Sequence, residues 1–186
     1  MEVGAIILAG GKSSRMGTDK GLLLFENKPM VLHLVETVKK ITKHILIIAN
    51  DSRYKSFGIP VYEDLMKNSG PLAGIYTGLY HTPFEKNIVL SCDTPLVKVD
   101  LLQILIDNCE NCQVTIPIKD DKTHQLIGIY SKSCLPIIQY EIDKKRLRIK
   151  DFLSKIDLKT VDANQIHFQE FLNFNTLEEL KQYYEN

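Results

Sequence analysis

Apolar and polar residues along this chain are grouped into segments that predict strands and helices in alternation. Several short apolar runs have the length of β-strands, and the first of them, Val3–Leu8, contains no polar side chain. A run of that kind is typical of a strand in a sheet that helices cover on both faces. The predicted strands cover residues 3–8, 45–49, 59–62, 87–91, 114–118 and 126–130, with a further candidate at 158–161.

The segments between these runs place apolar residues at helical spacing. Met30, Leu34 and Val38 fall on one face of a predicted helix that opens at Pro29 and runs to about Lys40, and proline is favoured at the first helical position. Further helices are predicted over residues 70–80, 100–109, 133–143, 148–156 and 177–185.

Two of these helices carry capping signals in the sequence. Asp100 is the predicted N-cap of the helix over 100–109, because a short acidic side chain can accept a hydrogen bond from the first turn. Thr176 with Glu179 has the spacing of a capping box and predicts the start of the last helix.

The alternation of strands and helices predicts an α/β fold with a mostly parallel sheet and helices on both faces. A length of 186 residues suits one domain over residues 1–186. The polar segment 119–125 (KDDKTHQ) indicates a hairpin or a long loop. Ligands bind beyond the carboxyl ends of the strands in such sheets, so the residues that follow each strand are the informative ones.

The segment that follows the first strand combines glycines with cations. Gly10, Gly11 and Gly17 let backbone N–H groups approach a ligand, and Arg15 and Lys20 add full positive charges. Neither the GxxxxGK[ST] nor the GxGxxG motif is present. A plain surface turn is the alternative, but this combination after a buried strand predicts a phosphate-binding loop.

Polar residues also follow the other central strands. Asn50 is either a turn residue or a reader of a base or ribose edge, and position alone leaves both open. Asp64 either caps the next helix or accepts hydrogen bonds from a nucleobase or ribose. Asp93 follows the strand over 87–91, and next to a triphosphate it is the best single candidate for Mg²⁺, with a simple turn role as the alternative.

Composition narrows the classes of partner. The chain has 23 Lys and Arg against 23 Asp and Glu, so its formal net charge is zero. A basic field that attracts nucleic acid is therefore not expected. Neither a signal peptide nor a membrane-spanning run is predicted, which indicates a cytosolic protein whose four cysteines are thiols.

Taken together, the motifs resemble those of a known family. The segment LAGGKSSRMGTDK (8–20) is similar to the first signature of nucleotidyltransferases that act on sugar nucleotides and cofactors. Asp64 ahead of GPLAG (70–74), CDTP (92–95) and NFNTLEEL (173–180) complete a set that resembles the MobA-type molybdenum cofactor guanylyltransferases. The matches extend from residue 4 to about residue 180.

The resemblance implies a three-layer Rossmann-like sheet of the nucleotide-diphospho-sugar transferase type. It implies transfer of GMP from GTP to molybdopterin, with release of pyrophosphate and formation of molybdopterin guanine dinucleotide. Residues 1–95 would mainly bind the nucleotide, and residues 96–186 would mainly bind the acceptor. The residues implied to contact GTP are Leu8, Ala9, Gly10, Gly11, Lys20, Asn50, Asp64 and Asp93.

The charges of the loop and the resemblance together assign roles within the expected site. Arg15, Lys20 and Asp93 are the catalytic candidates, and Asp93 would hold Mg²⁺. Asn173 and Asn175 are candidates for the pterin side. Proteins that deliver the cofactor to molybdoenzymes are candidate partners. The chain departs from relatives after Asn50, where Asp51 stands in place of a basic residue, and the role of Asp51 stays open.

Other features of the sequence are less specific. The basic run 143–152 is expected to be a solvated face, with a docking patch for the pterin phosphate around Arg146 and Arg148 as the alternative. Cys109 and Cys112 lack a second pair at matching spacing, so a zinc site is disfavoured. None of the histidines is assigned to catalysis.

Three rival functions remain at this level. A sister nucleotidyltransferase would use CTP, or transfer to a sugar phosphate. A non-catalytic carrier would bind nucleotide or pterin without releasing pyrophosphate, although Asp93 and Lys20 together argue against it. A nicotinamide-dependent oxidoreductase is disfavoured because the GxGxxG fingerprint is missing.

Overall fold

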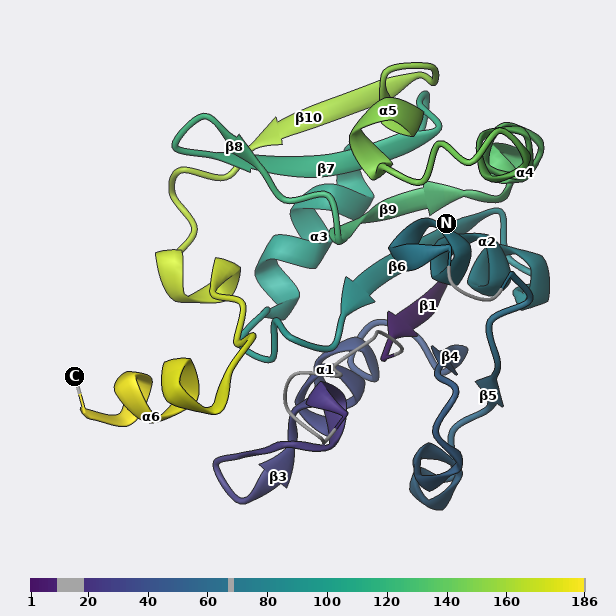
Figure 1. Ribbon diagram of the computed structural model, residues 1–186. Helices are drawn as coiled ribbons and strands as arrows, with labels where there is room; N and C mark the ends of the chain where they lie inside the picture. The colour runs from purple at the N-terminus through teal and green to yellow at the C-terminus, as the bar shows by residue number, and fades with distance from the viewer. Residues whose placement is uncertain (10–18, 67–68, 186) are drawn as a thin grey trace.

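The central sheet is mostly parallel, and one strand in its middle runs the other way. The computed structural model describes residues 1–9, 19–66 and 69–185. The strand order is β10-β7-β9-β6-β1-β4-β5, with β8 paired to β7 (Figure 1). The strands are β1 (Val3–Leu8), β4 (Ile45–Ile48), β5 (Val61–Tyr62), β6 (Lys86–Ser91), β7 (Val114–Lys119), β8 (Lys122–Thr123), β9 (Ile127–Ser131) and β10 (Leu158–Asp162).

The strands differ in the direction in which they pair. β1 pairs in parallel with β4 and β6, and β4 with β5, while β10 pairs in parallel with β7. β9 lies between β6 and β7 and is antiparallel to both. β7 and β8 form a hairpin, with Asp120 and Asp121 at positive φ in its turn. The segment 119–125 therefore contains a tight hairpin followed by a connection into β9.

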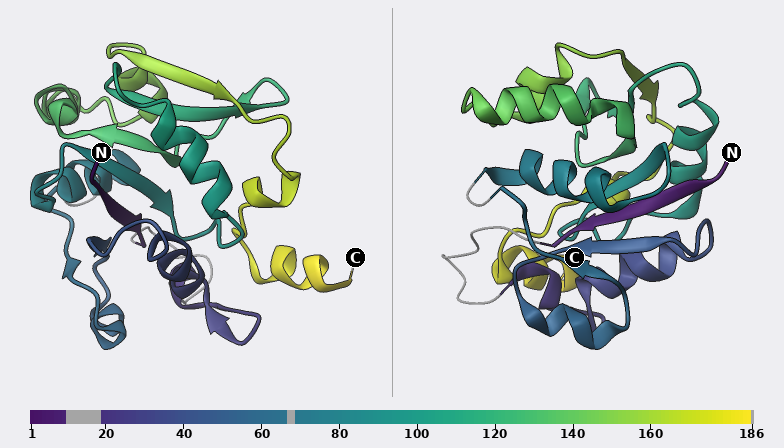
Figure 2. Two further views of the ribbon diagram at one scale, coloured as in Figure 1. Left: turned by 180° about the vertical axis from the view of Figure 1, so that it is seen from behind. Right: turned by 90° about the vertical axis from the view of Figure 1, so that its right-hand side faces the viewer.

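Helices cover both faces of the sheet, as the sequence predicted (Figure 2). On one face α1 (Met30–Val38) packs on β1, and α3 (Val99–Asp107) packs on β9 and β7. Ala5 and Ile7, alternate residues of β1, belong to the apolar cluster on this face. On the other face α2 (Gly70–His81) packs on β1, and Ile6 and Leu8 belong to a second apolar cluster. That cluster also takes in residues of α4 (Leu135–Asp143) and α5 (Ile149–Leu153). Because side chains alternate along a strand, an all-apolar β1 serves both cores.

A third, smaller cluster joins the two ends of the chain. A hairpin that the sequence did not predict, β2 (Leu24–Phe25) with β3 (Lys28–Pro29), packs against α6 (Leu177–Glu185). The buried members of this cluster are Leu23, Phe25, Met30, Phe174 and Leu180. The segment before α6 is thereby held next to residues 20–30.

The two capping predictions have different outcomes. The N-cap of α3 is Lys98, and Asp100 lies in the first turn, so the prediction of Asp100 as N-cap is wrong by two residues. At α6 the Thr176 hydroxyl accepts a hydrogen bond from the Glu179 N–H at 3.1 Å, as in a capping box. The Glu179 carboxylate accepts from the Asn175 N–H at 2.5 Å, one residue further back than expected. Helix dipoles favour acids anywhere in a first turn, which accounts for Asp100.

The predicted helices near the end of the chain are shortened. The one expected over 133–143 is divided into a 3₁₀ turn, η3 (Lys132–Cys134), and α4, and the one expected over 148–156 is reduced to α5. All four cysteines are free thiols, in agreement with the sequence. Within the described residues, no helix is long and apolar enough to cross a membrane.

Candidate active site

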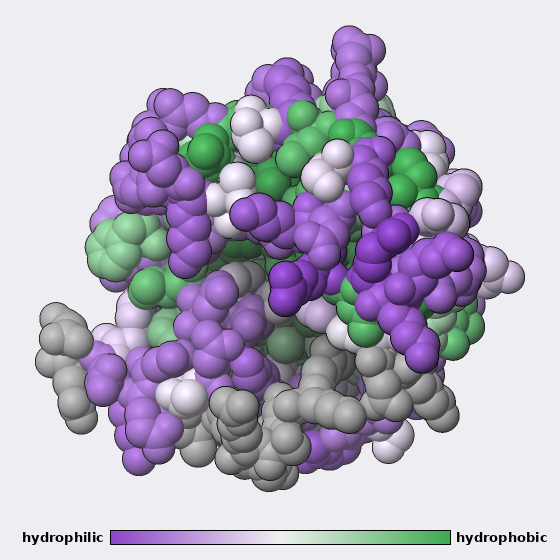
Figure 3. Space-filling model, turned by 45° about the horizontal axis from the view of Figure 1, so that its top comes forward, coloured by the Kyte–Doolittle hydropathy of each residue, from purple (hydrophilic) through white to green (hydrophobic). Residues whose placement is uncertain are grey.

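A cleft opens where β1, β4 and β6 end at their carboxyl edges. Its volume is ≈ 220 Å³. Hydrophilic side chains cover most of the face shown in Figure 3, and smaller apolar areas lie between them. The lining residues come from these strand ends, from the segment before β2 and from the start of α2: Leu8, Ala9, Asp19, Lys20, Ile48, Asp64, Gly70, Pro71, Gly74, Ser91, Cys92, Asp93 and Leu126.

Lys20 enters this cleft from a short 3₁₀ turn, η1 (Lys20–Leu22). Asp19 caps the turn, because its carboxylate accepts a hydrogen bond from the Gly21 N–H at 3.1 Å. The Lys20 ammonium donates to the Asn175 side-chain oxygen at 2.8 Å. Two predicted site residues that lie 155 positions apart in the chain therefore touch.

Asp93 lies in the turn that follows β6. The turn is closed by the Thr94 hydroxyl, which donates to the Ser91 carbonyl at 2.8 Å. The backbone carbonyl of Asp93 accepts from the Phe174 N–H at 2.8 Å. Among the described residues nothing hydrogen-bonds to its carboxylate, so the side chain is not needed for the turn.

Asn50 and Asp64 follow β4 and β5 and meet at the edge of the cleft. The Asn50 side-chain oxygen accepts a hydrogen bond from the Asp64 N–H at 3.2 Å. The Oδ1 atom of Asp64 is buried without a hydrogen-bond partner within the described part of the chain. Burial raises the pKa of Asp64 above its usual range. A buried acceptor of this kind fits an N–H or O–H donor supplied by a ligand.

Gly74 leaves space for that carboxylate. A Cβ at this position of α2 would lie 3.2 Å from a methyl of Leu8 and 3.7 Å from Oδ1 of Asp64. A larger side chain here would fill the cleft between β1 and α2. The G-P-L-A-G segment therefore has a physical reason for its last glycine.

Asp51 has a local role instead. Its carboxylate accepts from the Arg53 N–H at 2.9 Å and pairs with the Arg53 guanidinium at 2.6 Å. These bonds cap the 3₁₀ helix η2 (Ser52–Phe57) and lower the pKa of Asp51. The residue that departs from the family pattern thus supplies a cap.

A second cavity of ≈ 220 Å³ lies next to the first. The two share Ser91, Asp93 and Leu126, so Asp93 stands between them. Asn173 lines this second cavity, together with Thr94, Lys122, Thr123, His124, Gln125, Ile127 and Ile149. The sequence motifs include no residue of the segment 122–125. The one signal in the sequence there is a polar stretch before a predicted strand.

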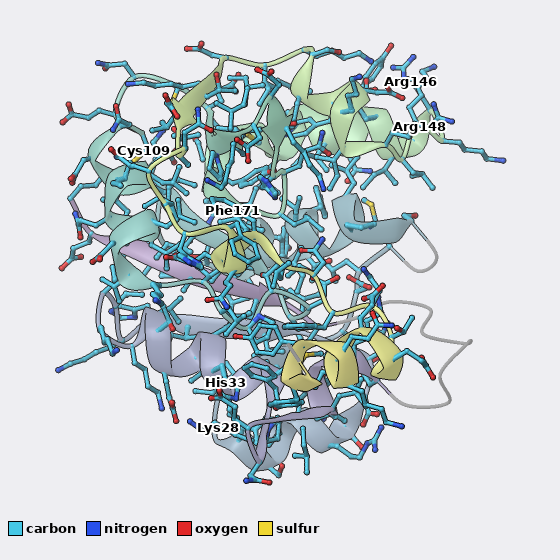
Figure 4. The ribbon with its side chains drawn as sticks, turned by 90° about the vertical axis from the view of Figure 1, so that its left-hand side faces the viewer. Lys28, His33, Cys109, Arg146, Arg148 and Phe171 are labelled. Atoms are coloured by element: carbon cyan, nitrogen blue, oxygen red, sulfur yellow. The ribbon has the colours of Figure 1, made fainter. Side chains whose placement is uncertain are left out.

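His124 is a titratable group that lines this second cavity. Burial lowers the pKa of His124, and the nearby Lys122 and Lys119 lower it further. The centroid of its ring lies 4.4 Å from the ring centroid of Phe171. Figure 4 labels Phe171 on the C-terminal segment, near the middle of the view. A neutral imidazole here offers one donor and one acceptor to a ligand.

The basic run includes a structural ion-pair network. Arg146 and Lys155 donate to the Glu141 carboxylate at 2.8 and 2.6 Å, and the Glu141 side chain is inaccessible to solvent. These hydrogen bonds lower the pKa of Glu141 to about 2. Arg146, in the linker after α4, is therefore committed to Glu141, and Lys155 ties the segment after α5 to α4. A docking role stays a prediction for Arg148, which is exposed at the outer edge of the molecule (Figure 4).

Other residues that the sequence analysis considered have structural roles or lie outside the described residues. His33 is structural, because its Nε2 atom lies 2.8 Å from the Phe25 carbonyl oxygen. Figure 4 shows His33 below Phe171 and close to Lys28. Cys109 is buried and hydrogen-bonds to a backbone carbonyl, and the described residues contain no cluster of three or more His, Cys, Asp or Glu that could hold a metal alone. Gly10, Gly11 and Arg15 lie outside the described residues.

The chain matches a known protein family. The family model of the MobA-like NTP transferase domain matches residues 5–159. The chain belongs to this family. It is a nucleotidyltransferase, and its MobA-like domain has the predicted mostly parallel sheet with helices on both faces.

Relatives of similar length support the assignment. A probable molybdenum cofactor guanylyltransferase of Flavobacterium johnsoniae is 41% identical over 94% of this chain and 92% of its own. One from Carboxydothermus hydrogenoformans is 37% identical over 91% of this chain and 89% of its own.

Solved structures share the fold of this MobA-like domain. A putative protein of Aquifex aeolicus superimposes with a TM-score of 0.78 at 36% identity, covering 92% of both chains. The molybdopterin-guanine dinucleotide biosynthesis protein A of Archaeoglobus fulgidus gives a TM-score of 0.83 over 98% of this chain and 97% of its own. At 22% identity the latter supports the fold alone.

Proposed function

We propose that this chain transfers GMP from GTP to molybdopterin, releasing pyrophosphate and forming molybdopterin guanine dinucleotide. The observation that carries the proposal is the position of Asp93 between two adjoining cavities. One cavity would hold the nucleotide and the other the acceptor, so the two phosphates would meet at Asp93. The names of the relatives support guanylyl transfer in particular.

The first cavity suits a nucleotide. Its floor is formed by Leu8 and Ala9 at the end of β1, next to the predicted phosphate loop. The unpartnered oxygen of Asp64 is placed to accept from the amino and imino groups of guanine or from a ribose hydroxyl. Asn50 holds the Asp64 backbone and lies at the same edge.

The residues present fit Mg²⁺ together with a nucleotide. Mg²⁺ prefers oxygen ligands and commonly uses one or two carboxylates with phosphate oxygens. Asp93 offers a carboxylate that is free of other described partners, and burial raises the pKa of the adjacent Cys92 thiol, so that no thiolate competes. The bound ion would neutralise charge on the phosphates, and Asp93 is the residue that would hold it.

The second cavity suits the acceptor. Lys122 offers a positive charge for a phosphate, and Asn173, Gln125 and a neutral His124 offer paired donors and acceptors for a heterocycle. Residues 1–95 contribute most of the nucleotide side and residues 96–186 most of the acceptor side. The bond between Lys20 and Asn175 joins the two halves.

The reaction then needs mainly positioning. An oxygen of the molybdopterin phosphate attacks the α-phosphorus of GTP, a new P–O–P bond forms, and the bond to the β-phosphate oxygen breaks. Pyrophosphate leaves with the electron pair, and Lys20, with Arg15 as its predicted companion, balances the departing charge. A phosphate monoester is already anionic near neutral pH, so a general base is not required.

Pyrophosphate release tests this proposal. The purified protein is mixed with Mg²⁺, molybdopterin and GTP, CTP, UTP or ATP in separate reactions. Of the four nucleotides, we expect GTP to be the one that releases pyrophosphate, and we expect this release to require molybdopterin. Preference for CTP would indicate a sister cytidylyltransferase, and nucleotide binding without release would indicate a carrier; either outcome contradicts the proposal.

A further inference from the structure

Tyr54 is a fully buried tyrosine whose hydroxyl reaches the edge of the nucleotide cleft. It lies on η2, and its O–H donates to the Oδ1 atom of Asp19. The carbonyl oxygen of Ala9 lies 3.4 Å from the same hydroxyl. Ala9 and Asp19 are the residues on either side of segment 10–18, so one phenol contacts both ends of the predicted phosphate loop.

The position of this phenol is fixed by its surroundings. Its ring packs in the same core as Ala9, Ala49 and Cys92, and edge-on against Phe57 at a centroid distance of 6.0 Å. Asp51 caps the start of η2, and Gly58 ends it in the left-handed region at φ 68°. Burial raises the pKa of Tyr54, which keeps the hydroxyl protonated as a donor.

Through Asp19 the phenol controls the backbone that carries Lys20. The Oδ1 atom that accepts from Tyr54 also accepts from the Gly21 N–H, at 3.1 Å. A Cβ on Gly21 would collide with the Tyr54 hydroxyl and would lie 3.2 Å from the Cβ of Cys92. The η1 turn is thus seated in a notch between Tyr54 and Cys92, and only glycine fits at its second position.

We propose that Tyr54 is a positioning residue that ties the two ends of the phosphate loop and sets the place of the Lys20 ammonium in the cleft. The inference rests on the nucleotide-binding part of the proposed function and is independent of the base and of the acceptor. Nothing in the sequence motifs pointed to Tyr54, since it lies outside all of them.

The variant Tyr54→Phe tests this role, because it removes one hydroxyl and keeps the ring. We expect kcat/KM for GTP to fall by about tenfold or more, which is the scale of a lost hydrogen bond to a charged group. KM for molybdopterin should stay within about twofold of the original value, because its cavity is untouched. A kcat/KM for GTP within about twofold of the wild type would overturn the inference.

Thr82→Val is a matched control for loss of stability. Thr82 is buried and its hydroxyl donates to Asn87 at 2.7 Å. It lies at the far end of α2, about 12 to 18 Å along the helix from Gly74 and Gly70, which line the cleft. The control should lower the urea midpoint at least as much as Tyr54→Phe while keeping kcat/KM for GTP. A parallel loss of activity in the control would show that Tyr54→Phe acts through stability, and the inference would fail.

A double-mutant cycle with Asp19→Asn tests the route of the effect. If Tyr54 acts through Asp19, the double variant should be no slower than Asp19→Asn alone. Independent contributions would multiply, and that outcome would reject the route through Asp19.

Binding of inorganic pyrophosphate separates this inference from the proposed function. If the wild type releases no pyrophosphate with any nucleotide, guanylyl transfer is refuted. The Tyr54→Phe protein should still bind Mg²⁺-pyrophosphate about tenfold more weakly than the wild type. Equal affinities for pyrophosphate would overturn the positioning role in either case.

Discussion

The Lys20 ammonium donates to the side-chain oxygen of Asn175 at 2.8 Å, and this bond joins the segment after the predicted phosphate loop to the segment before α6. The Asn175 N–H in turn donates to the Glu179 carboxylate, which anchors the asparagine to the last helix. A triphosphate in the cleft would compete with Asn175 for the same ammonium. We therefore expect nucleotide binding and the position of Asn175 to be linked.

Lys20→Ala should weaken GTP binding and slow turnover. The lysine is the described cation of the nucleotide cavity, and its loss leaves phosphate charge unbalanced. We expect affinity for GTP, measured by calorimetry, to fall roughly tenfold to a hundredfold. Lys28→Ala serves as the control, because Lys28 forms a surface ion pair with Glu36 on the neighbouring hairpin and helix. Unchanged affinity and rate in Lys20→Ala would contradict a role for Lys20 in binding the nucleotide.

Asp93→Ala should abolish Mg²⁺-dependent transfer in a folded protein. The carboxylate has no described hydrogen-bond partner, so its removal leaves the turn closed by Thr94 and Ser91. We expect kcat to fall by roughly a hundredfold or more, while the thermal midpoint stays near that of the wild type. Asp107→Ala on the surface of α3, where the Asp107 carboxylate accepts from Gln103 at 2.8 Å, is the control. Near-normal turnover by folded Asp93→Ala would contradict the metal assignment.

Asp64→Asn should bind GTP more weakly and still resist unfolding at least as well as the wild type at pH 7. Burial raises the pKa of Asp64 in the folded protein, so the charged form is disfavoured there. Ionisation of Asp64 therefore destabilises the folded protein as pH rises through the raised pKa. This destabilisation is absent below the ordinary pKa of 3.8. Replacing the carboxylate by an amide removes that cost at neutral pH.

Denaturation curves at pH 4 and pH 7, together with GTP titrations, measure both effects of Asp64→Asn. The difference in stability between variant and wild type should be larger at pH 7. A variant that is less stable at pH 7 yet binds GTP normally would assign Asp64 to the fold and not to the nucleotide.

Glu141→Gln should lower stability at neutral pH and leave transfer unchanged. Hydrogen bonds from Arg146 and Lys155 lower the Glu141 pKa to about 2 in the folded protein, from an ordinary value of 4.5. The stabilisation is therefore complete above pH 4.5 and is lost as pH falls through about 2. Urea midpoints of the two proteins should converge over that range. A drop in kcat without a drop in midpoint would give Glu141 and Arg146 a role in acceptor binding.

The sequence predicted the candidate site best for residues that directly follow a strand. Asp93 could be placed at the edge of a central strand because the apolar run over 87–91 ends just before it. The layered fold followed from the fully apolar β1, whose alternate residues feed two cores. The hairpin alternative for segment 119–125 implies that β9 is antiparallel to β7, as it is. The insertion of β9 between β7 and β6 could not be predicted, since an apolar run does not specify which strands it pairs with.

Long-range contacts account for the other omissions. Tyr54 is part of a short 3₁₀ helix with no periodic signal, and its role depends on Asp19, which lies 35 residues earlier. Asn175 was a candidate from its motif, but its bond to Lys20 depends on the packing of β2, β3 and α6. The cap of α3 was misplaced because an acidic residue is favoured at several positions of a first turn.

The small core that unites residues 23–30 with residues 174–180 has a consequence for the order of events during synthesis. On a ribosome the strand and loop that come first would be complete long before Phe174 and Leu180 emerge. Until then Phe25 and Met30 lack their buried partners, and Lys20 lacks Asn175. The cleft begins near the N-terminus, yet in a nascent chain its lysine would gain the Asn175 partner only when the segment before α6 is made.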